Sequence, residues 1–248
     1  MEKPQNIYDN EKFYNDYISL RKNIVNANDL LEIPIMKEML PDLKGKSVLD
    51  LGCGYGEMSK YFVDMGAKKV VACDISENML NLANKVNSNE KIEYKLLAME
   101  DLNNLDEKFD LIFSSLAFHY IEDFDKLIQD ISNHLNENGI LLFSQEHPIT
   151  TCTKHLDKEA KKLVINGKKF HLLSDYNVVG KRESNWNVEG VIKYHRNFKT
   201  TLNTIINNGL EILAIDESWA RKEAVEVSEK YYNQNDKPYF LFVKAKKK

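Results

Sequence analysis

Short apolar runs alternate with stretches of helical periodicity between about residue 47 and residue 145. This alternation is typical of βαβ units, in which parallel strands form a sheet whose two faces are covered by helices. We therefore predict an α/β fold for this part of the chain. The apolar runs predict strands near 47–51, 69–73, 92–98, 109–114 and 139–145.

Helical periodicity follows the second and the fourth of these runs. One helix is predicted to begin at Ser76, a favourable N-cap residue, and to carry Met79, Ala83 and Val86 on one face. Another is predicted at about 123–136, where apolar residues again recur at helical spacing. We interpret both apolar stripes as faces that pack on the sheet.

The remaining segments surround this region. Residues 149–196 mix polar, charged and aromatic side chains without a clean period, which indicates an insertion or lid. After it, a helix from Phe198 to Gly209 and apolar runs at 210–215 and 239–243 bring the sheet to about seven strands. The expected division is a helical N-terminal cap at 1–46, a ligand-binding core at 47–148, a lid at 149–196 and the end of the core sheet at 197–248.

Composition narrows the class of protein. A chain of 248 residues with 43% hydrophobic residues can bury a full core. Its formal net charge of -4 and its pI of about 5.9 argue against a surface built to neutralise phosphates, so no nucleic-acid partner is expected. No apolar run approaches the roughly 20 residues that cross a bilayer, and no apolar signal region follows Met1. We expect a soluble, cytoplasmic protein without a membrane partner.

The cysteines suggest neither a metal site nor a disulfide framework. Cys53, Cys73 and Cys152 are scattered, lack metal-ligand spacing and are odd in number. We therefore expect reduced thiols and no metal.

A glycine-rich turn follows the first predicted strand, in the sequence Gly52-Cys53-Gly54-Tyr55-Gly56. Glycines let the backbone approach a ligand closely at the start of a helix, so this turn predicts a nucleotide-like cofactor. The pyrophosphate fingerprint G-x-G-x-x-G requires a third glycine at position 57, where this chain has Glu57. A carboxylate there suits a pyrophosphate poorly, but it is compatible with a cofactor that carries a sulfonium and an amine.

Two aspartates accompany this turn. Asp74 ends the second predicted strand, where its carboxylate can accept hydrogen bonds from both hydroxyls of a ribose. The alternative role, capping the next helix, already falls to Ser76. Asp50 lies inside an apolar strand, where an unpaired carboxylate is costly, so we expect backbone amides, water or a cofactor amine to hold it.

Together these motifs resemble the class I S-adenosylmethionine-dependent methyltransferases, in particular their small-molecule branch with the type 11 methyltransferase domain. Residues 48–56 (VLDLGCGYG) are similar to the first motif of that family, and residues 74–80 (DISENML) to its second. Residues 97–102, 110–120 and 139–144 resemble its adenine-contacting segment, its motif after the fourth strand and its fifth strand. Ala98 departs from the family pattern, because many relatives carry an aspartate there.

The resemblance implies a Rossmann-like sheet of seven mostly parallel strands, with helices on both faces and the last strand antiparallel. It also implies S-adenosylmethionine as cofactor. In the front segment, aromatic faces including Tyr17 would attract a sulfonium, and Arg21 could reach a carboxylate. The cofactor-binding residues that we predict are Tyr17, Arg21, Asp50, Gly52, Cys53, Gly54, Asp74, Ile75, Met79, Met99, Glu100, Asp101 and Ser114.

Methyl transfer from a sulfonium is an in-line displacement, so much of its acceleration can come from holding the nucleophile close and aligned. A base is needed only where the acceptor must lose a proton, and histidine is well matched to that task. His119 and His147 follow the fourth and fifth predicted strands, at the edge where α/β sheets bind ligands, and are the catalytic candidates. Packing roles are the alternative for both. Candidates for substrate contact are His119, His147, Trp186, Tyr194 and His195.

The leading hypothesis is a methyltransferase that acts on a small-molecule acceptor. A non-catalytic module that binds a cofactor or a partner is the alternative, because no residue is unambiguously catalytic. A nicotinamide oxidoreductase is disfavoured by Glu57. The acceptor, the methylated atom and the oligomeric state are left open.

Overall fold

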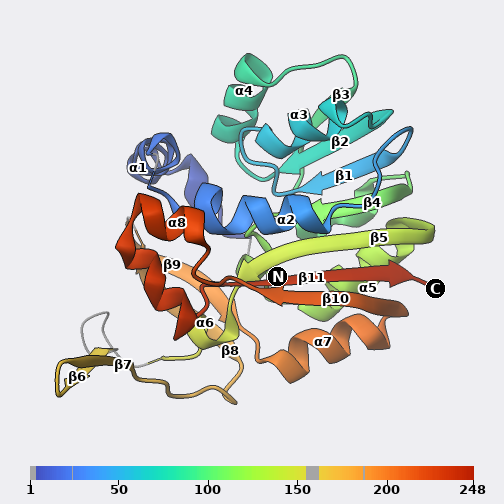
Figure 1. Ribbon diagram of the computed structural model, residues 1–248. Coiled ribbons are helices and arrows are strands. Elements are labelled where there is room, and N and C mark those ends of the chain that lie inside the picture. Colours follow the sequence, from blue (N-terminus) through green and yellow to red (C-terminus); the bar gives the residue numbers. More distant parts are fainter. Residues whose placement is uncertain (1–3, 24, 155–161, 187) are drawn as a thin grey trace.

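A seven-stranded sheet forms the centre of the computed structural model, which describes residues 4–23, 25–154, 162–186 and 188–248. The strand order is β10-β11-β5-β4-β1-β2-β3, and β11 runs antiparallel to both β10 and β5 (Figure 1). The fold class predicted from the sequence is therefore confirmed. The strands are β1 (Ser47–Leu51), β2 (Lys69–Asp74), β3 (Ile92–Leu96), β4 (Phe109–Ser114), β5 (Leu135–Glu146), β10 (Leu210–Glu217) and β11 (Phe240–Lys247).

Helices cover both faces of this sheet (Figure 1). The α-helices are α1 (Glu11–Lys22), α2 (Ile33–Met39), α3 (Glu57–Asp64), α4 (Glu77–Val86), α5 (Phe124–His134), α6 (Pro148–Thr151), α7 (Phe198–Asn207) and α8 (Lys222–Val227). Short helical turns of other types are η1 (Ile7–Asp9), η2 (Asn28–Glu32), η3 (Met99–Asn104), η4 (Phe118–Tyr120) and η5 (Glu229–Asn235). Within the described ranges, no helix has the length and apolarity that crossing a bilayer requires.

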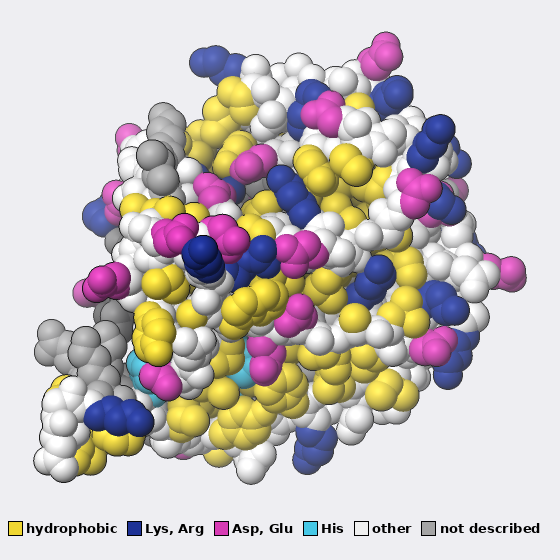
Figure 2. Space-filling model, in the orientation of Figure 1, with side chains coloured by type: hydrophobic (Ala, Val, Ile, Leu, Met, Phe, Trp, Pro, Cys, Tyr) yellow, Lys and Arg dark blue, Asp and Glu magenta, His cyan; other side chains and the backbone are white. Residues whose placement is uncertain are grey.

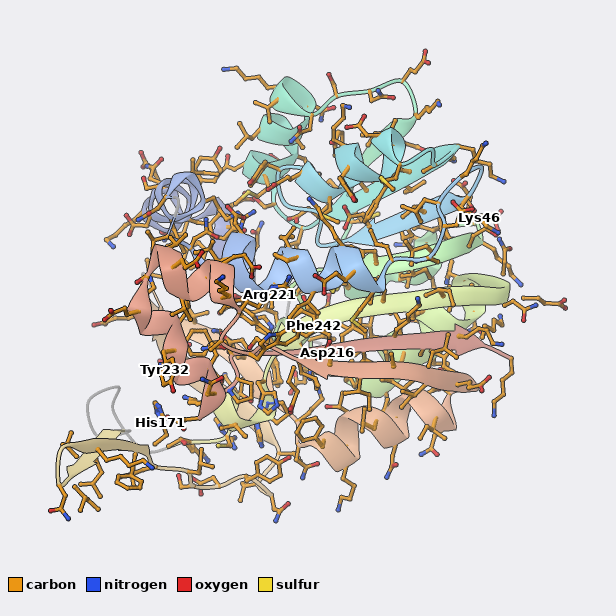
Figure 3. The ribbon with its side chains drawn as sticks, viewed as in Figure 1. Lys46, His171, Asp216, Arg221, Tyr232 and Phe242 are labelled. Atoms are coloured by element: carbon orange, nitrogen blue, oxygen red, sulfur yellow. The ribbon has the colours of Figure 1, made fainter. Side chains whose placement is uncertain are left out.

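Side chains alternate between the two faces of the sheet along each strand, so the hydrophobic core has one layer on each face. Leu49 and Leu51 of β1 pack with Ile131 of α5, while Val48 packs on the opposite face with the residues of α2 and α3. Phe242 of β11 lies on that second face, on the strand next to the edge strand β10 (Figure 3). Because successive strand side chains point to opposite faces, buried parallel strands read as continuous apolar runs, as they do in this sequence.

The helix boundaries follow local capping. Ser76 caps α4 by accepting a hydrogen bond from the Met79 amide at 3.1 Å, as predicted. Asp123 caps α5 in the same way, through the Lys126 amide at 3.0 Å.

The segment 149–196 contains more regular structure than its sequence texture indicated. Besides α6, it forms the hairpin of β6 (Lys162–Ile165) and β7 (Lys168–His171) and the hairpin of β8 (Gly180–Trp186) and β9 (Val188–His195). Asn166 and Gly167, both with positive φ, make the two-residue turn between β6 and β7. Asn-Gly is a favoured pair for such a turn, because both of its residues tolerate left-handed backbone.

The last glycine of the turn after β1 is required by its surroundings. Gly56 has φ of 80° and begins α3, and a Cβ at this position would lie 2.1 Å from the hydroxyl oxygen of Tyr94. That hydroxyl is fixed by its own hydrogen bond to the Asn87 carbonyl at 3.0 Å. Both the backbone conformation and the packing therefore exclude a side chain.

We expect Gly56→Ala to lower the free energy of unfolding by about 1–3 kcal/mol more than Gly45→Ala, because overpacking is added to backbone strain. Gly45 is a matched control, since its φ of 72° is similar but no heavy atom would lie within 4 Å of its Cβ. Urea unfolding of both variants measures the difference. Equal losses would show that Tyr94 moves aside without cost.

Candidate active site

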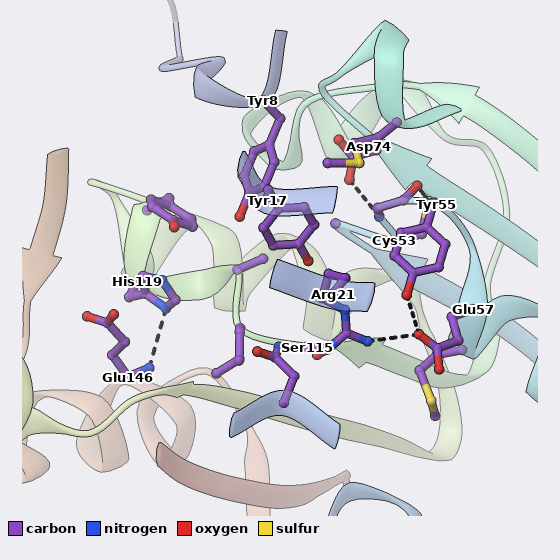
Figure 4. Close-up of a pocket in the computed structure, with 18 of the residues that line it drawn as sticks. Tyr8, Tyr17, Arg21, Cys53, Tyr55, Glu57, Asp74, Ser115, His119 and Glu146 are labelled. Atoms are coloured by element: carbon purple, nitrogen blue, oxygen red, sulfur yellow. Dashed lines mark hydrogen bonds and ion pairs between the residues drawn. The ribbon is translucent and has the colours of Figure 1, made fainter. Parts of the chain in front are cut away.

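A cavity of about 510 Å³ opens at the carboxyl edge of the parallel strands, the usual ligand site of open α/β sheets. Its walls include the glycine turn after β1, the start of α4, the start of η3 and the ends of β4 and β5. In Figure 4, Asp74 and Tyr55 lie on one side, His119 and Glu146 on the other, and Tyr8 and Tyr17 between them. One cavity therefore joins the two groups of residues that the sequence singled out.

The glycine turn is held against the end of β2. The amides of Gly52 and Cys53 both donate to the Cys73 carbonyl, at 2.8 and 3.0 Å. A Cβ on Gly52, whose φ is 72°, would lie 2.8 Å from the Cβ of Ala117 and 2.9 Å from the Cε of Met99. The turn thus brings bare backbone to the cavity wall, where a ligand can approach it.

Asp74 connects this turn to α4. Its two carboxylate oxygens accept hydrogen bonds from the Gly54 amide at 2.8 Å and the Ser76 amide at 2.9 Å. The side chain lines the cavity and is buried, and burial raises the pKa of Asp74 above its usual value. Asp74 is therefore a fixed carboxylate at the junction of the two motifs.

Glu57, the residue that replaces a third glycine, is balanced by Arg21 of α1. The Glu57 carboxylate accepts hydrogen bonds from Arg21 at 2.8 Å and from the Tyr55 hydroxyl at 2.6 Å. Burial acts to raise the pKa of Glu57, but these two partners outweigh it and the pKa lies below its usual value. Arg21 also pairs with Asp29 at 2.9 Å. This charged cluster closes one end of the cavity.

Two buried carboxyl groups lie under the cavity. Asp50 accepts a hydrogen bond from the Ser59 hydroxyl of α3 at 2.6 Å, so its partner is a helix side chain, which was not among the partners predicted from the sequence. Glu32 of η2 accepts hydrogen bonds from the hydroxyls of Ser115 and Ser144, at 2.9 and 2.6 Å. Burial raises the pKa of each acid to about 7. Desolvation favours the neutral form of both.

The N-terminal segment crosses the cavity as a strap. The Gln5 side chain bonds to both the amide and the carbonyl of Ile192 in β9, at 2.9 and 3.4 Å. At the other end, the Asp9 carboxylate accepts hydrogen bonds from the Ser76 hydroxyl and, at 3.1 Å, from the Asn78 amide. Tyr8 lies between these anchors and lines the cavity.

Tyr8 contacts the other aromatic rings of this region edge to face. Its ring centroid is 5.2 Å from that of Tyr17 and 6.4 Å from that of Tyr120. Such T-shaped pairs are a favoured aromatic geometry. The tyrosines therefore form a continuous wall between Asp74 and His119.

His119 lies on η4, opposite the end of β5. Its Nδ1 accepts a hydrogen bond from the Glu146 backbone amide at 3.3 Å, and burial lowers the pKa of His119 to about 3. A neutral ring whose Nδ1 accepts must carry its proton on Nε2. Within the described part of the chain no hydrogen bond engages Nε2, so His119 presents an N–H donor to the cavity that it lines.

The Glu146 carboxylate stands beside this donor. Its Oε1 pairs with Lys193 of β9 at 2.5 Å, and 23% of its side-chain surface remains exposed at the cavity. Burial acts to raise the pKa of Glu146, but the positive charge of Lys193 and its hydrogen bond outweigh burial, so the pKa lies below its usual value. Glu146 is therefore an ionised hydrogen-bond acceptor next to a histidine donor.

Arg196 fixes the turn that carries His119. Its guanidinium donates to the carbonyls of Phe118 and Ile121, at 2.5 and 2.7 Å, and lies 4.4 Å from the ring centroid of Phe124. These carbonyls flank His119 on both sides. Arg196 is itself buried, so its role is to position the turn that carries His119.

Most predicted site residues meet at the cavity. Those that line it are Tyr17, Arg21, Asp50, Gly52, Cys53, Gly54, Asp74, Ile75, Met79, Met99, Glu100 and His119.

Two of the predicted cofactor residues point elsewhere. Asp101 is exposed on η3, and the Ser114 hydroxyl donates to the Leu51 carbonyl inside the sheet at 2.8 Å.

The structure does not bring His147, Tyr194 or His195 to the cavity. His147 is buried between Glu217, at 2.7 Å from its Nε2, and the Ile149 amide, at 3.1 Å from its Nδ1. His195 is engaged by the Thr151 hydroxyl and a backbone carbonyl, and the Tyr194 hydroxyl donates to a surface glutamate. The side chain of Trp186 lies outside the described residues.

Sequence reasoning missed the roles of Glu146 and Tyr120. Both follow directly from edge geometry, since Glu146 is the last residue of β5 and Tyr120 ends the turn after β4. The predicted fifth strand, 139–145, already placed Glu146 at the same sheet edge as His147.

Comparison with known proteins places this geometry in a family. A methyltransferase domain model matches residues 49–143. An uncharacterized protein of Haemophilus influenzae is 38% identical over 250 residues, which span 97% of this chain and 96% of that protein. The crystal structure of an S-adenosylmethionine-dependent methyltransferase from Mesorhizobium loti superposes with a TM-score of 0.79 at 32% identity, covering 87% of this chain and 97% of that one. A Listeria monocytogenes protein assigned the same activity gives 0.78 at 32% identity, covering 88% and 96%.

We expect Glu32→Gln to flatten the pH dependence of stability. The folded-state pKa of Glu32 is raised, so the folded protein keeps this proton to a higher pH than the unfolded chain does. Its contribution to stability is therefore lost as pH rises from the ordinary glutamate value of about 4.3 to about 7, and glutamine, which does not ionise, removes that loss.

Urea unfolding at about pH 5 and pH 8 measures this effect. Glu229→Gln is the control, because Glu229 is exposed on η5 and its replacement should leave the pH dependence unchanged. Parallel pH dependences for the wild type and Glu32→Gln would contradict the assignment.

Proposed function

Because this chain belongs to the S-adenosylmethionine-dependent methyltransferases, we propose that its cavity holds the cofactor in one half and a small-molecule acceptor in the other. One observation carries this proposal. The same cavity has the glycine turn and Asp74 on one side and the donor-acceptor pair of His119 and Glu146 on the other. Methyl transfer needs two reactants held face to face, and this arrangement supplies a place for each.

The residues of the cofactor half fit S-adenosylmethionine. A Cβ on Gly52 would fill the cradle against Ala117 and Met99, so the bare backbone there is suited to a close ligand. Asp74 would accept hydrogen bonds from the ribose hydroxyls, and Met99 with Glu100 would border the adenine. Tyr17 and Arg21 would hold the methionine end. When bound, the cofactor supplies an activated methyl group on a sulfonium.

The strap supports a small acceptor. Gln5 is bonded to β9 and Asp9 to the start of α4, so the segment between them covers the cavity on one side. On that side the strap stands between the cavity and a protein surface or a folded nucleic acid, which favours an acceptor small enough to enter the cavity. Lysine and arginine are also interspersed with aspartate and glutamate on the face in Figure 2, without a large basic area for phosphates.

A cytoplasmic location also belongs to the proposal. All three cysteines of the chain, Cys53, Cys73 and Cys152, are free thiols, which suits a reducing compartment.

We expect Asp74→Asn to weaken binding of S-adenosylhomocysteine by about 1–3 kcal/mol, or about 5- to 150-fold, because buried polar partners are lost. Isothermal titration calorimetry measures the affinity directly. Asp64→Asn is the control, since Asp64 is exposed on α3 and pairs only with Lys60 among the described residues. Equal affinities of the two variants would contradict the assignment of Asp74.

The acceptor class can be tested with cell extract separated into low-molecular-mass and macromolecular fractions. Each fraction is incubated with the enzyme and isotopically labelled S-adenosylmethionine, and products are analysed by mass spectrometry. We expect label in small molecules of the first fraction. Label confined to protein or RNA would contradict a small-molecule acceptor.

A further inference from the structure

The acceptor half of the cavity presents one hydrogen-bond donor and one hydrogen-bond acceptor side by side. The donor is the Nε2–H of His119, whose tautomer is set by the Glu146 amide at Nδ1. The acceptor is the carboxylate of Glu146, which keeps one oxygen outside the pair with Lys193. His119 lies on the turn η4 that follows β4, and Glu146 ends β5, which is paired with β4 in the sheet.

A hydroxyl group satisfies both partners at once. Its O–H can donate to the carboxylate of Glu146, and one oxygen lone pair can accept from the Nε2–H of His119. A second lone pair then remains to attack the methyl group. This count of donors and lone pairs distinguishes a hydroxyl from an amine and from a carboxylate. A thiol has the same count, but its S–H is a weak donor and its sulfur a weak acceptor, so it would satisfy His119 and Glu146 less well.

Other acceptor groups satisfy the pair less well. An amine has a single lone pair, and a hydrogen bond from His119 would occupy the electrons that must attack. A carboxylate has lone pairs to spare but no proton, and it would face the negative charge of Glu146 at close range.

We propose that the methylated atom of the acceptor is a hydroxyl oxygen, that Glu146 accepts its proton and that His119 holds the oxygen through Nε2–H. This proposal rests on the proposed function, because it names the acceptor class of the same cavity. Glu146 is then a catalytic residue, because it contacts the reacting hydroxyl. Lys193 positions Glu146, and Arg196 positions the turn that carries His119.

The step balances within the two reactants and Glu146. The O–H bond breaks and its proton passes to the Glu146 carboxylate, while an oxygen electron pair forms the new bond to the methyl carbon. The bond from that carbon to sulfur breaks and its electrons return to sulfur. The products are a methyl ether, S-adenosylhomocysteine and protonated Glu146, which releases the proton to water.

The surroundings favour a phenolic or enolic hydroxyl. Lys193 makes Glu146 a weak base, and a weak base serves an acidic hydroxyl better than an aliphatic one. The rings of Tyr8 and Tyr120 border the same space and can pack edge to face on an aromatic acceptor.

The test compares Glu146→Gln with Glu217→Gln in the full chain. Glu217 is a matched control, because it pairs with a buried histidine one residue along from Glu146 but does not line the cavity. Products from the low-molecular-mass extract are identified by mass spectrometry and NMR, and initial rates are then measured with the identified acceptor. S-adenosylhomocysteine affinity is measured for every variant.

We expect an O-methyl ether as product. Glu146→Gln should lower kcat by about 10²- to 10⁴-fold, with Glu146→Asp retaining part of the rate, while Glu217→Gln stays close to wild type. Affinity for S-adenosylhomocysteine should change by less than about twofold in all three, because Glu146 lies in the acceptor half. If Glu146→Gln does not fold, because it leaves Lys193 buried without its carboxylate, the double variant Glu146→Gln/Lys193→Met replaces it.

Three other outcomes would each refute one element of the proposal. An N-methyl, S-methyl or methyl ester product refutes the hydroxyl class and leaves the methyltransferase function intact. An ether formed at an unchanged kcat by Glu146→Gln refutes Glu146 as the proton acceptor. Absence of any small-molecule product with the wild type, despite bound S-adenosylhomocysteine, refutes the proposed acceptor class itself.

Discussion

The cofactor half of the cavity depends on the two hydrogen bonds that the Asp74 carboxylate accepts from backbone amides. This carboxylate receives the Gly54 amide on one oxygen and the Ser76 amide on the other, so the glycine turn, the end of β2 and the start of α4 are fixed to one side chain. Without these two hydrogen bonds, no shared side chain would fix the position of the glycine turn relative to the start of α4. The strap adds to the same junction, because Asp9 bonds to Ser76 and to the amide of Asn78.

Buried charge in the rest of the cavity is organised by specific partners. Buried Arg21 pairs with the half-exposed Glu57, Lys193 pairs with Glu146, and Arg196 donates to two carbonyls of the turn that carries His119. Isolated buried ions are costly, so each pair constrains the element that supplies its partner. In this way β9, which contributes no described residue to the cavity wall, still positions the acceptor half.

The sheet could be predicted from the sequence because each strand and turn is identified by its own neighbouring residues. Buried parallel strands are apolar on both faces, and the turn residues between them are glycine or good N-caps, so β1, β2, β4 and β5 and the cap at Ser76 were predictable. The edge strand β3 is half-exposed and was predicted from its place in the alternation of strands and helices. The hairpins of residues 162–195 were missed because their strands are half-exposed and carry polar residues on both faces. Only the Asn166-Gly167 turn signalled one of them.

The residues of the candidate site also fall into those that local motifs predict and those that only the fold brings together. Gly52, Gly54 and Asp74 follow from motif and strand end, whereas the partners of Glu57 and Glu146 come from α1 and β9, distant in sequence. His147 illustrates the limit most clearly. It occupies the expected edge, yet the antiparallel insertion of β11 and the side chain of Glu217 bury it away from the cavity.

A crystal structure with bound S-adenosylhomocysteine tests the central claim most directly. We expect the ribose hydroxyls to contact Asp74, the adenine to lie beside Met99 and the sulfur to face His119 and Glu146. A ligand whose ribose contacts His119, or whose sulfur faces away from Glu146, would contradict the division of the cavity into a cofactor half and an acceptor half.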